Sequence, residues 1–333
     1  MVLSSSGELP ACLFIATGGT IAMQVDPSTS APIPALSGSD LLKAVPELAT
    51  MARLEVNNLS NVPSVEMGPL RWRRLHREIE AALAREAIVG VLVSHGTDTL
   101  EETAWFLDLT LTSDKPVVLI GAQRNASEAD FDGPRNLKSG TRVCIAPESA
   151  GKGVMVVLND QINAAREVSK THTSDVESFN SGDAGLLGRV DGDRVTFYRA
   201  SCRRQSLPLG DAELPRVDIV PMYAGADGAL LGAAVQAGAR GLVIQALGAG
   251  NVNAAMYAAI LEAIAAGIAV VIASRVPRGR VRPIYGFTGG GVTLKDAGVI
   301  FANDLSPQKA RIMLMLAMQV PRSSTELQAI FDR

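Results

Sequence analysis

The sequence contains few cysteines, and they lie far apart. Cys12, Cys144 and Cys202 are odd in number and widely scattered along 333 residues. This spacing fits neither a disulfide framework nor a zinc knuckle. We therefore expect reduced thiols in a cytosolic protein.

Positive charge, aromatic residues and long apolar runs are also scarce. Lysines and arginines number 31 against 34 acidic residues, a net charge of −3, which argues against a nucleic-acid partner. Aromatic residues make up only 4%, which favours tightly packed α/β layers. No apolar stretch is of membrane-spanning length, and no signal-peptide pattern precedes the first predicted strand. We expect a soluble, cytoplasmic protein with no membrane partner.

Short apolar runs alternate with helical patterns along the whole chain. Continuous apolar runs are typical of strands buried on both faces of a parallel sheet. The predicted strands are Cys12–Ala16, Ile88–Ser94, Pro116–Gly121, Gly153–Leu158, Val217–Pro221, Gly241–Leu247 and Gly267–Ala273. The predicted helices are Leu70–Ala84, Leu100–Leu111, Ala229–Ala237 and Asn253–Ala265.

This alternation predicts an α/β fold with two domains. We expect a larger N-terminal parallel-sheet α/β domain at 1–200 that carries the catalysis. A linker at 201–215, rich in proline and arginine, would lead to a smaller C-terminal α/β domain at 216–333. The irregular stretch Asp26–Gly38 is either a surface connection or an active-site lid.

Two polar turns follow predicted strands, where ligands of parallel sheets bind. The first is Thr17-Gly18-Gly19-Thr20, an ordinary glycine turn unless other evidence supports it. Its spacing does not match a dinucleotide fingerprint.

The second turn is HGTDT at 95–99, which leads into a predicted helix. Asp98 or Thr99 could simply cap that helix by accepting backbone N–H groups. His95 alone is more often a structural histidine than a catalyst. The three histidines, His76, His95 and His172, have no metal-binding spacing, so we expect no metal site.

Lys170 stands in the irregular segment REVSKTHTSDVESF at 166–179. Without context, it is a solvated surface charge. A buried lysine oriented by an aspartate could instead activate a threonine hydroxyl, which is a weak nucleophile by itself.

The segments FIATGGTIA and GVLVSHGTDTL match the two signature motifs of the bacterial-type asparaginase and glutaminase family, which the chain resembles. KPVVLIGAQR, DGPRNL, REVSKTHTSDVESF, ALGAGNVN, SRVPRGR and the stretch Leu305–Met318 resemble later landmarks of that family in the same order. The resemblance covers about residues 11–330.

The resemblance implies roles for individual residues. Thr17 corresponds to the primary nucleophile, and Thr97, Asp98 and Lys170 to the set that activates the hydroxyl or the attacking water. The substrate-binding positions of the family correspond to Ser64, Gly96 and Ala122; Ser64 would hold the substrate carboxylate, and the Ala122 carbonyl would receive the leaving amide. The family's active sites lie between subunits, so the resemblance implies a homodimer or homotetramer.

The sequence departs from the family at positions that contact the α-amino group of the substrate. The family's lid tyrosine has no counterpart between residues 18 and 64, and its acidic partner is missing from Tyr285–Leu294. Val65 replaces a glutamine, and Ala249 an asparagine, although Asn251 is close by.

We therefore expect hydrolysis of L-asparagine through a threonine acyl-enzyme, with no metal or organic cofactor. The alternatives are deamidation of D-asparagine, glutamine or a succinamate-like amide, and a non-catalytic carboxylate-binding relative. A tRNA-linked amidotransferase subunit would be expected to carry an extra amino-terminal domain and a basic surface.

Overall fold

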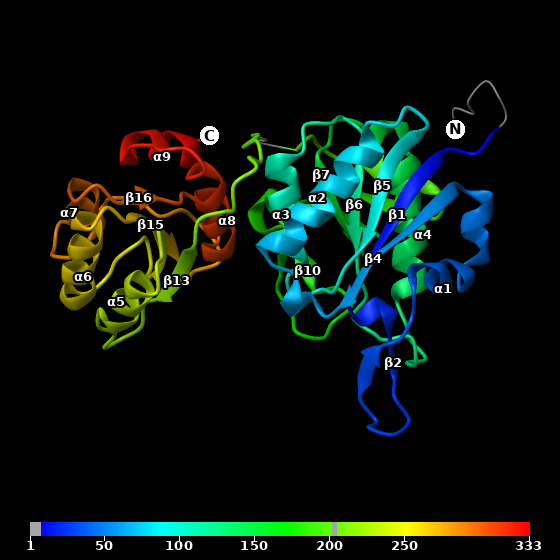
Figure 1. Ribbon diagram of the computed structural model, residues 1–333, viewed down its shortest axis with the longest axis horizontal. Coiled ribbons are helices and arrows are strands. Elements are labelled where there is room, and N and C mark those ends of the chain that lie inside the picture. Colours follow the sequence, from blue (N-terminus) through cyan, green and yellow to red (C-terminus); the bar gives the residue numbers. More distant parts are fainter. Residues whose placement is uncertain (1–7, 202–204) are drawn as a thin grey trace. The chain divides into compact units, whose positions relative to one another are not determined.

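The computed structural model describes residues 8–201 and 205–333 (Figure 1). Residues 1–7, Cys202 and the arginines at 203 and 204 of the predicted linker lie outside the described residues. The chain divides into two compact units, residues 1–206 and 207–333. The linker at 201–215 and the roles given to the two domains stay predictions.

Unit 1 is built on a mostly parallel eight-stranded sheet of order β12-β11-β8-β7-β6-β5-β1-β4. Its strands are β1 (Ala11–Gly18), β4 (Arg53–Val62), β5 (Ile88–Ser94), β6 (Val117–Ile120), β7 (Val154–Leu158), β8 (Gln161–Ala164), β11 (Gly188–Asp191) and β12 (Arg194–Phe197). Five neighbouring strands of this sheet, β4, β1, β5, β6 and β7, run parallel to one another. The prediction of a larger N-terminal α/β domain is confirmed.

The other end of the sheet is antiparallel, which the sequence patterns did not predict. β8 pairs antiparallel with β7 and β11, and β12 with β11. Asn159 and Asp160 form the two-residue connection between β7 and β8, both with positive φ (49° and 61°). Such a connection reverses the chain, because parallel strands need a long crossover.

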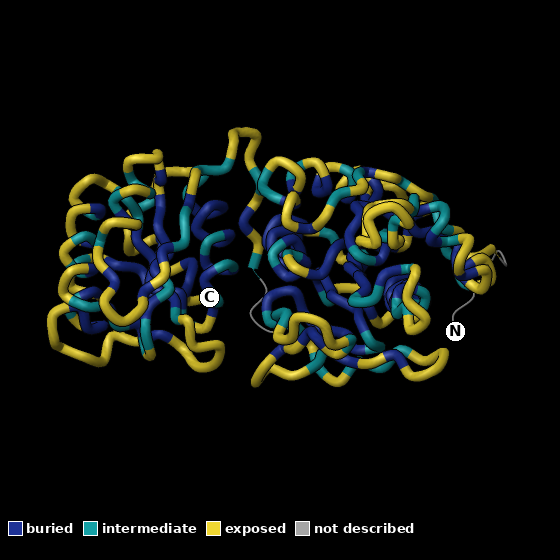
Figure 2. Tube along the Cα trace, turned by 90° about the horizontal axis from the view of Figure 1, so that it is seen from below, coloured by how far each residue is buried: buried dark blue, intermediate teal, exposed yellow. Residues whose placement is uncertain are grey.

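Helices cover both faces of this sheet. They are α1 (Gly38–Lys43), α2 (Pro69–Leu83), α3 (Leu100–Thr110) and α4 (Gly133–Ile145). Alternate strand residues such as Phe14 and Leu92 pack with Leu41 of α1 and Leu137 of α4 in one core cluster. α2 and α3 lie against the opposite face (Figure 1), and the ring of Trp72 in α2 stacks on that of Phe106 in α3. Figure 2 shows the buried strands at the centre of each unit and the exposed loops around them.

Two cysteines that are far apart in sequence meet in this core. Cys12 of β1 and Cys144 of α4 are buried, free thiols, with 3.6 Å between their sulfur atoms. Hydrogen bonding to Cys12 and burial raise the pKa of the Cys144 thiol well above its usual value. The Cys144 thiol is therefore protonated near neutral pH.

The irregular segment after the first polar turn folds into a hairpin. β2 (Met23–Val25) pairs antiparallel with β3 (Pro32–Pro34). Asp26 holds the turn, because its carboxylate accepts from the backbone N–H groups of Ser28 and Thr29. The Ala126 N–H donates to the Met23 carbonyl, which ties the base of the hairpin to the rest of unit 1. Its function as a lid stays a prediction.

Unit 2 has a parallel four-stranded sheet of order β13-β14-β15-β16. The strands are β13 (Val217–Pro221), β14 (Gly241–Ala246), β15 (Ala269–Ser274) and β16 (Ile300–Phe301), and the helices are α5 (Ala229–Gln236), α6 (Ala254–Ala265), α7 (Gly291–Asp296), α8 (Pro307–Ala317) and α9 (Ser324–Phe331). The prediction of a smaller C-terminal α/β domain is confirmed.

Smaller elements complete the fold. β9 (Ser169–Lys170) and β10 (Phe179–Asn180) form a separate antiparallel pair. The short 3-10 helices are η1 (Thr20–Ala22), η2 (Pro46–Thr50), η3 (Ser64–Glu66), η4 (Pro147–Ser149) and η5 (Gly182–Ala184). Over residues 8–201 and 205–333, no helix combines the length and apolar character that crossing a bilayer requires.

Candidate active site

The predicted site residues gather at the carboxyl edge of four neighbouring parallel strands in unit 1. β4, β1, β5 and β6 are adjacent and run in one direction, so the segments that follow them meet at one edge. These four strand ends carry Thr17, Ser64, Gly96, Thr97, Asp98 and Ala122. Lys170 comes from β9, outside the sheet.

Glycine is required where these turns touch. A Cβ atom on Gly19 would lie 2.2 Å from the Cα of Gly96, and one on Gly96 would lie 2.8 Å from the Cβ of Ser64. Gly18 and Gly19 also have φ of 109° and 86°, which side chains rarely adopt. The first turn, the second turn and Ser64 are therefore in direct contact, and only glycine permits it.

Ser64 is buried and fixed to the second turn. It begins η3, and its carbonyl accepts a hydrogen bond from the Thr99 hydroxyl at 2.6 Å. Thr99 is the N-cap residue of α3, but its side chain makes no capping hydrogen bond. The expectation that this side chain caps the helix is wrong, because its hydroxyl is used to hold Ser64.

Lys170 joins two residues of the second turn. Its Nζ donates to Thr97 Oγ1 at 2.9 Å and to Asp98 Oδ1 at 2.7 Å. The lysine side chain is only 15% exposed. Lys170 is therefore not the solvated surface charge that its sequence context alone predicts.

The direction of these bonds leaves a proton available on Thr97. An ammonium group only donates, so the Thr97 oxygen accepts from Lys170 and its own hydroxyl proton can go to a third group. The Asp98 carboxylate orients the lysine from the solvent side, since its side chain is 63% exposed. A lysine, a carboxylate and a hydroxyl in this order can pass a proton to or from a bound molecule.

Thr17 is not hydrogen-bonded to this set in the described structure. It lies in β1, is buried, and donates from Oγ1 to the Ser94 carbonyl at 2.8 Å. The Ser60 hydroxyl donates to the Thr17 carbonyl at 3.0 Å. The Thr17 hydroxyl proton is therefore directed to the Ser94 carbonyl in this structure.

Glu101 also contacts the candidate site, which the sequence patterns did not predict. It lies on the first turn of α3, is 5% exposed, and accepts the main-chain N–H of Lys170 at 2.6 Å. No sequence pattern could reveal this contact, because 69 positions separate the two residues.

His95 has a structural place in the site. Its Nδ1 lies 2.7 Å from the Gly96 carbonyl and its Nε2 lies 2.9 Å from the Thr103 hydroxyl, which accepts from the Trp72 indole N–H. A carbonyl only accepts, so Nδ1 carries the proton. Burial lowers the pKa of His95 to about 4. The neutral ring thus holds the Gly96 peptide in place.

Ala122 lies in a turn fixed by a carboxylate. Asp132 accepts the main-chain N–H groups of Gln123 and Arg124 at 2.9–3.2 Å. A Cβ on Gly121 would lie 3.0 Å from Cγ2 of Thr97. The turn after β6 therefore contacts the HGTDT turn directly.

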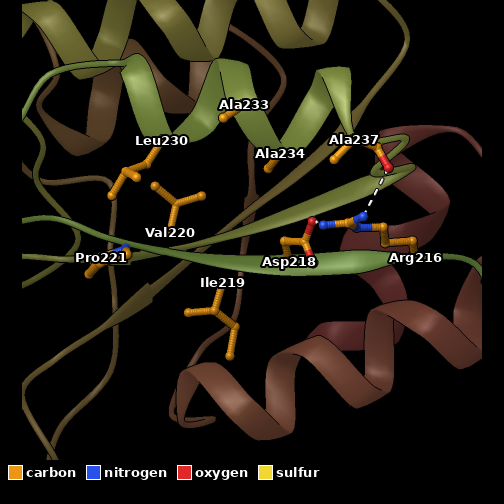
Figure 3. A pocket seen from close by; sticks show the side chains of 9 residues that line it. All are labelled: Arg216, Asp218, Ile219, Val220, Pro221, Leu230, Ala233, Ala234 and Ala237. Carbon is orange, nitrogen blue, oxygen red and sulfur yellow. Dashed lines mark hydrogen bonds and ion pairs between the residues drawn. The ribbon is translucent and has the colours of Figure 1, made fainter.

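The cavities of the described structure lie elsewhere. One of about 450 Å³ in unit 2 is lined by β13 and α5 (Figure 3). Its charged residues, Arg216 and Asp218, pair with each other at 2.7 Å, and the remaining lining is apolar. A second, of about 960 Å³, lies beside the amino ends of β1 and β4, opposite the site. None of the candidate site residues lines either of these two cavities.

Two family models together match most of the chain. Residues 11–203 match the model described as "Asparaginase, N-terminal", and residues 216–331 match the "Glutaminase/Asparaginase C-terminal domain".

Similar proteins extend the match to full length. L-asparaginase 2 of Bacillus subtilis is 36% identical, over 99% of this chain and 88% of that protein. L-asparaginase 2 of Escherichia coli is 35% identical, over 100% and 97%. The crystal structure of a probable cytoplasmic L-asparaginase from Campylobacter jejuni has a TM-score of 0.88 and 35% identity, over 97% of this chain and 99% of that one.

Proposed function

This chain belongs to the asparaginase family, and from that premise we propose that it hydrolyses L-asparagine to aspartate and ammonia. The observation that carries the proposal is the Lys170–Thr97–Asp98 contact at the sheet edge that Thr17 also reaches. An amidohydrolase needs a nucleophile and a route for protons, and this edge offers hydroxyls for the first and a lysine for the second.

The proposed first step is attack by the Thr17 hydroxyl on the side-chain amide carbon. The hydroxyl leaves the Ser94 carbonyl, Oγ1 bonds to the amide carbon, and the C–N bond breaks. The proton from Oγ1 passes through the Thr97 hydroxyl and Lys170 to the amide nitrogen, which leaves as ammonia. The product of this step is an ester on Thr17.

Water then resolves the ester. The attacking water gives a proton to the Thr97 hydroxyl, which passes its own proton to Lys170 as that ammonium group, oriented by Asp98, gives up another proton in the same relay. The water oxygen bonds to the ester carbon, the proton returns to Thr17 Oγ1, and aspartate leaves. Donors around Gly96 and Thr97 stabilise the negative oxygen in both steps.

We assign substrate contacts to the residues beside this set. The Ser64 hydroxyl holds the substrate carboxylate, which its contact with Gly96 supports. The Ala122 carbonyl accepts from the leaving amide, which the contact between its turn and Thr97 supports.

Thr97 is the second candidate for the nucleophile. It is favoured by one observation: its Oγ1 already contacts Lys170, whereas Thr17 Oγ1 contacts a carbonyl. The two assignments place the ester on different peptides, so they can be separated.

Rapid quenching followed by peptide mass spectrometry tests the assignment. We expect the added mass on the peptide that contains Thr17, and we expect Thr17→Ala to lower kcat about a thousandfold or more. Thr17→Ser, which keeps a hydroxyl, is the matched control. An ester on the Thr97 peptide, or a folded Thr17→Ala enzyme with most of its activity, would show that Thr17 is not the nucleophile.

We further propose a homodimer or homotetramer with active sites at subunit interfaces. The exposure of the Asp98 side chain, 63% beside the largely buried Lys170, supports a site that a second chain covers. Sedimentation velocity should give a mass of two or four times 34.9 kDa, and a fully active species of 34.9 kDa would contradict it.

A cytoplasmic location is also proposed. The similar Campylobacter jejuni protein is named as a probable cytoplasmic L-asparaginase, and the buried free thiols Cys12 and Cys144 agree with a reducing compartment. A similar protein of Haemophilus influenzae, 35% identical, is named as a probable periplasmic L-asparaginase, so fractionation of cells is needed to decide.

A further inference from the structure

Residues of the segment from Thr97 to Glu101 contact both the side chain and the main chain of Lys170. The side-chain Nζ contacts Thr97 and Asp98 at 2.9 and 2.7 Å, and the main-chain N–H donates to Glu101 at 2.6 Å. Among these contacts, the bond to Glu101 alone fixes the lysine backbone rather than its flexible side chain.

The surroundings of Lys170 explain why such a bond matters. β9 has only two residues, and the chain that follows, from Thr171 to Asp175, is exposed. A lysine side chain is long and flexible, and it loses rotamer entropy when its ammonium group is fixed in one place. The pairing of β9 with β10 and the bond from the Thr171 N–H to the Ser178 carbonyl hold the neighbouring backbone, while the N–H of Lys170 itself donates to Glu101. Without that last bond, the lysine backbone would be free to shift and carry its ammonium group away from Thr97.

Glu101 can act as a rigid anchor. Every residue of α3 except Glu102 is buried, so the helix is a firm platform. The carboxylate lies at the positive end of that helix, where negative charge is stabilised. Hydrogen bonds to a charged acceptor are also about twice as strong as neutral ones.

We infer that Glu101 is a positioning residue, which acts by holding the backbone of Lys170 so that its ammonium group meets Thr97 and Asp98. The inference rests on the proposed catalytic function of Lys170. Glu101 itself donates no proton and touches no substrate in this scheme; its effect passes entirely through the lysine.

Steady-state kinetics on L-asparagine with three single variants test this. Glu101→Leu removes the acceptor and should lower kcat about ten- to hundredfold, with KM changed less than about twofold. Glu101→Gln keeps an acceptor oxygen and should restore most of that loss, leaving a reduction of about three- to tenfold. Glu102→Gln, which removes the same charge from the same helical turn, should leave kcat unchanged.

The double variant Glu101→Leu, Lys170→Met separates positioning from a general structural effect. It should be no slower than Lys170→Met alone, because Glu101 acts only through the lysine. An added loss equal to that of Glu101→Leu in the natural enzyme would overturn the inference. So would a folded Glu101→Leu enzyme with unchanged kcat; if the leucine variant does not fold, the same result with Glu101→Ala, which also lacks an acceptor, decides the matter.

The Lys170→Met variant alone tests the proposed function separately from the positioning by Glu101. If Lys170→Met keeps natural turnover, the lysine has no catalytic function and the scheme above is wrong. If Lys170→Met is inactive while both Glu101 variants turn over normally, only the positioning of Lys170 by Glu101 is wrong.

Discussion

Replacing Asp98 with asparagine should separate catalysis from stability more cleanly than any other change at this site. The side chain is 63% exposed, lies outside α3, and its contact at the site is the 2.7 Å ion pair with Lys170. Asparagine keeps the size and an acceptor oxygen but loses the charge. The change therefore acts on the orientation of the lysine and on little else.

The expected loss of stability is small. An ion pair with one exposed partner contributes about 0.2–1 kcal/mol, and 1 kcal/mol corresponds to roughly 2–4 °C in Tm for a domain of this size. The expected loss of activity is larger. Losing a hydrogen bond to a charged group costs about 1.5–3 kcal/mol, which is about a ten- to hundredfold fall in kcat.

Two measurements on one preparation check this expectation. Differential scanning calorimetry gives Tm, and a coupled assay for ammonia gives kcat. Asp98→Ala is the harsher comparison, since it also removes the acceptor oxygen. A fall of Tm by about 10 °C in parallel with activity, well beyond the shift expected for an exposed ion pair, would show that Asp98 serves the fold. The reasoning from its exposure would then be wrong.

Two further predictions concern His95 and the substrate. His95 is neutral in both folded and unfolded chains above its ordinary pKa of 6.5; below that pH, the unfolded ring takes a proton that the folded ring, with a pKa of about 4, refuses. When the pH falls from 6.5 to 4, the free energy of unfolding of the natural protein should therefore decrease by about 3 kcal/mol more than that of the His95→Asn variant. Urea titrations at the two pH values measure both decreases, and equal decreases would contradict the prediction. Val65 and Ala249 stand at positions that contact the substrate α-amino group in the family. L-asparagine should therefore show a raised KM, and D-asparagine and succinamate should be hydrolysed at comparable rates. A micromolar KM for L-asparagine with a thousandfold rejection of those two and L-glutamine would refute this argument from absence.

The buried strands of the fold could be predicted because they are continuous apolar runs. Ile88–Ser94 and Val217–Pro221 have the predicted bounds. β4 was missed because it is an edge strand, and its sequence RLEVNNLSNV mixes polar residues into both faces. α4 was missed because it begins at Gly133 and contains a second glycine, Gly140, where a Cβ would lie 2.6 Å from Ile120. That glycine serves packing against the sheet, which no helix propensity reveals.

The site could be predicted in part, and the limit has a physical reason. Turns after adjacent parallel strands must meet, so the proximity of Thr17, Ser64 and Gly96 follows from strand order. Lys170 belongs to no strand of that sheet, and its place followed only from the family resemblance. Glu101 and the ring of His95 act through contacts across 69 and 8 positions, which depend on how helices pack.

The candidate catalytic residues and the departures from the family differ in how far they are buried. Thr17, Thr97 and Ser64 are almost fully buried, and a Cβ atom on Gly121 or Gly96 would lie within 3.0 Å of Thr97 or Ser64. Val65, which is one of the departures from the family, is 69% exposed. Exposed positions tolerate substitution, because few contacts constrain them. We therefore expect substitutions at exposed positions such as Val65 to change substrate choice with little loss of stability, and substitutions in the buried turns to cost packing as well.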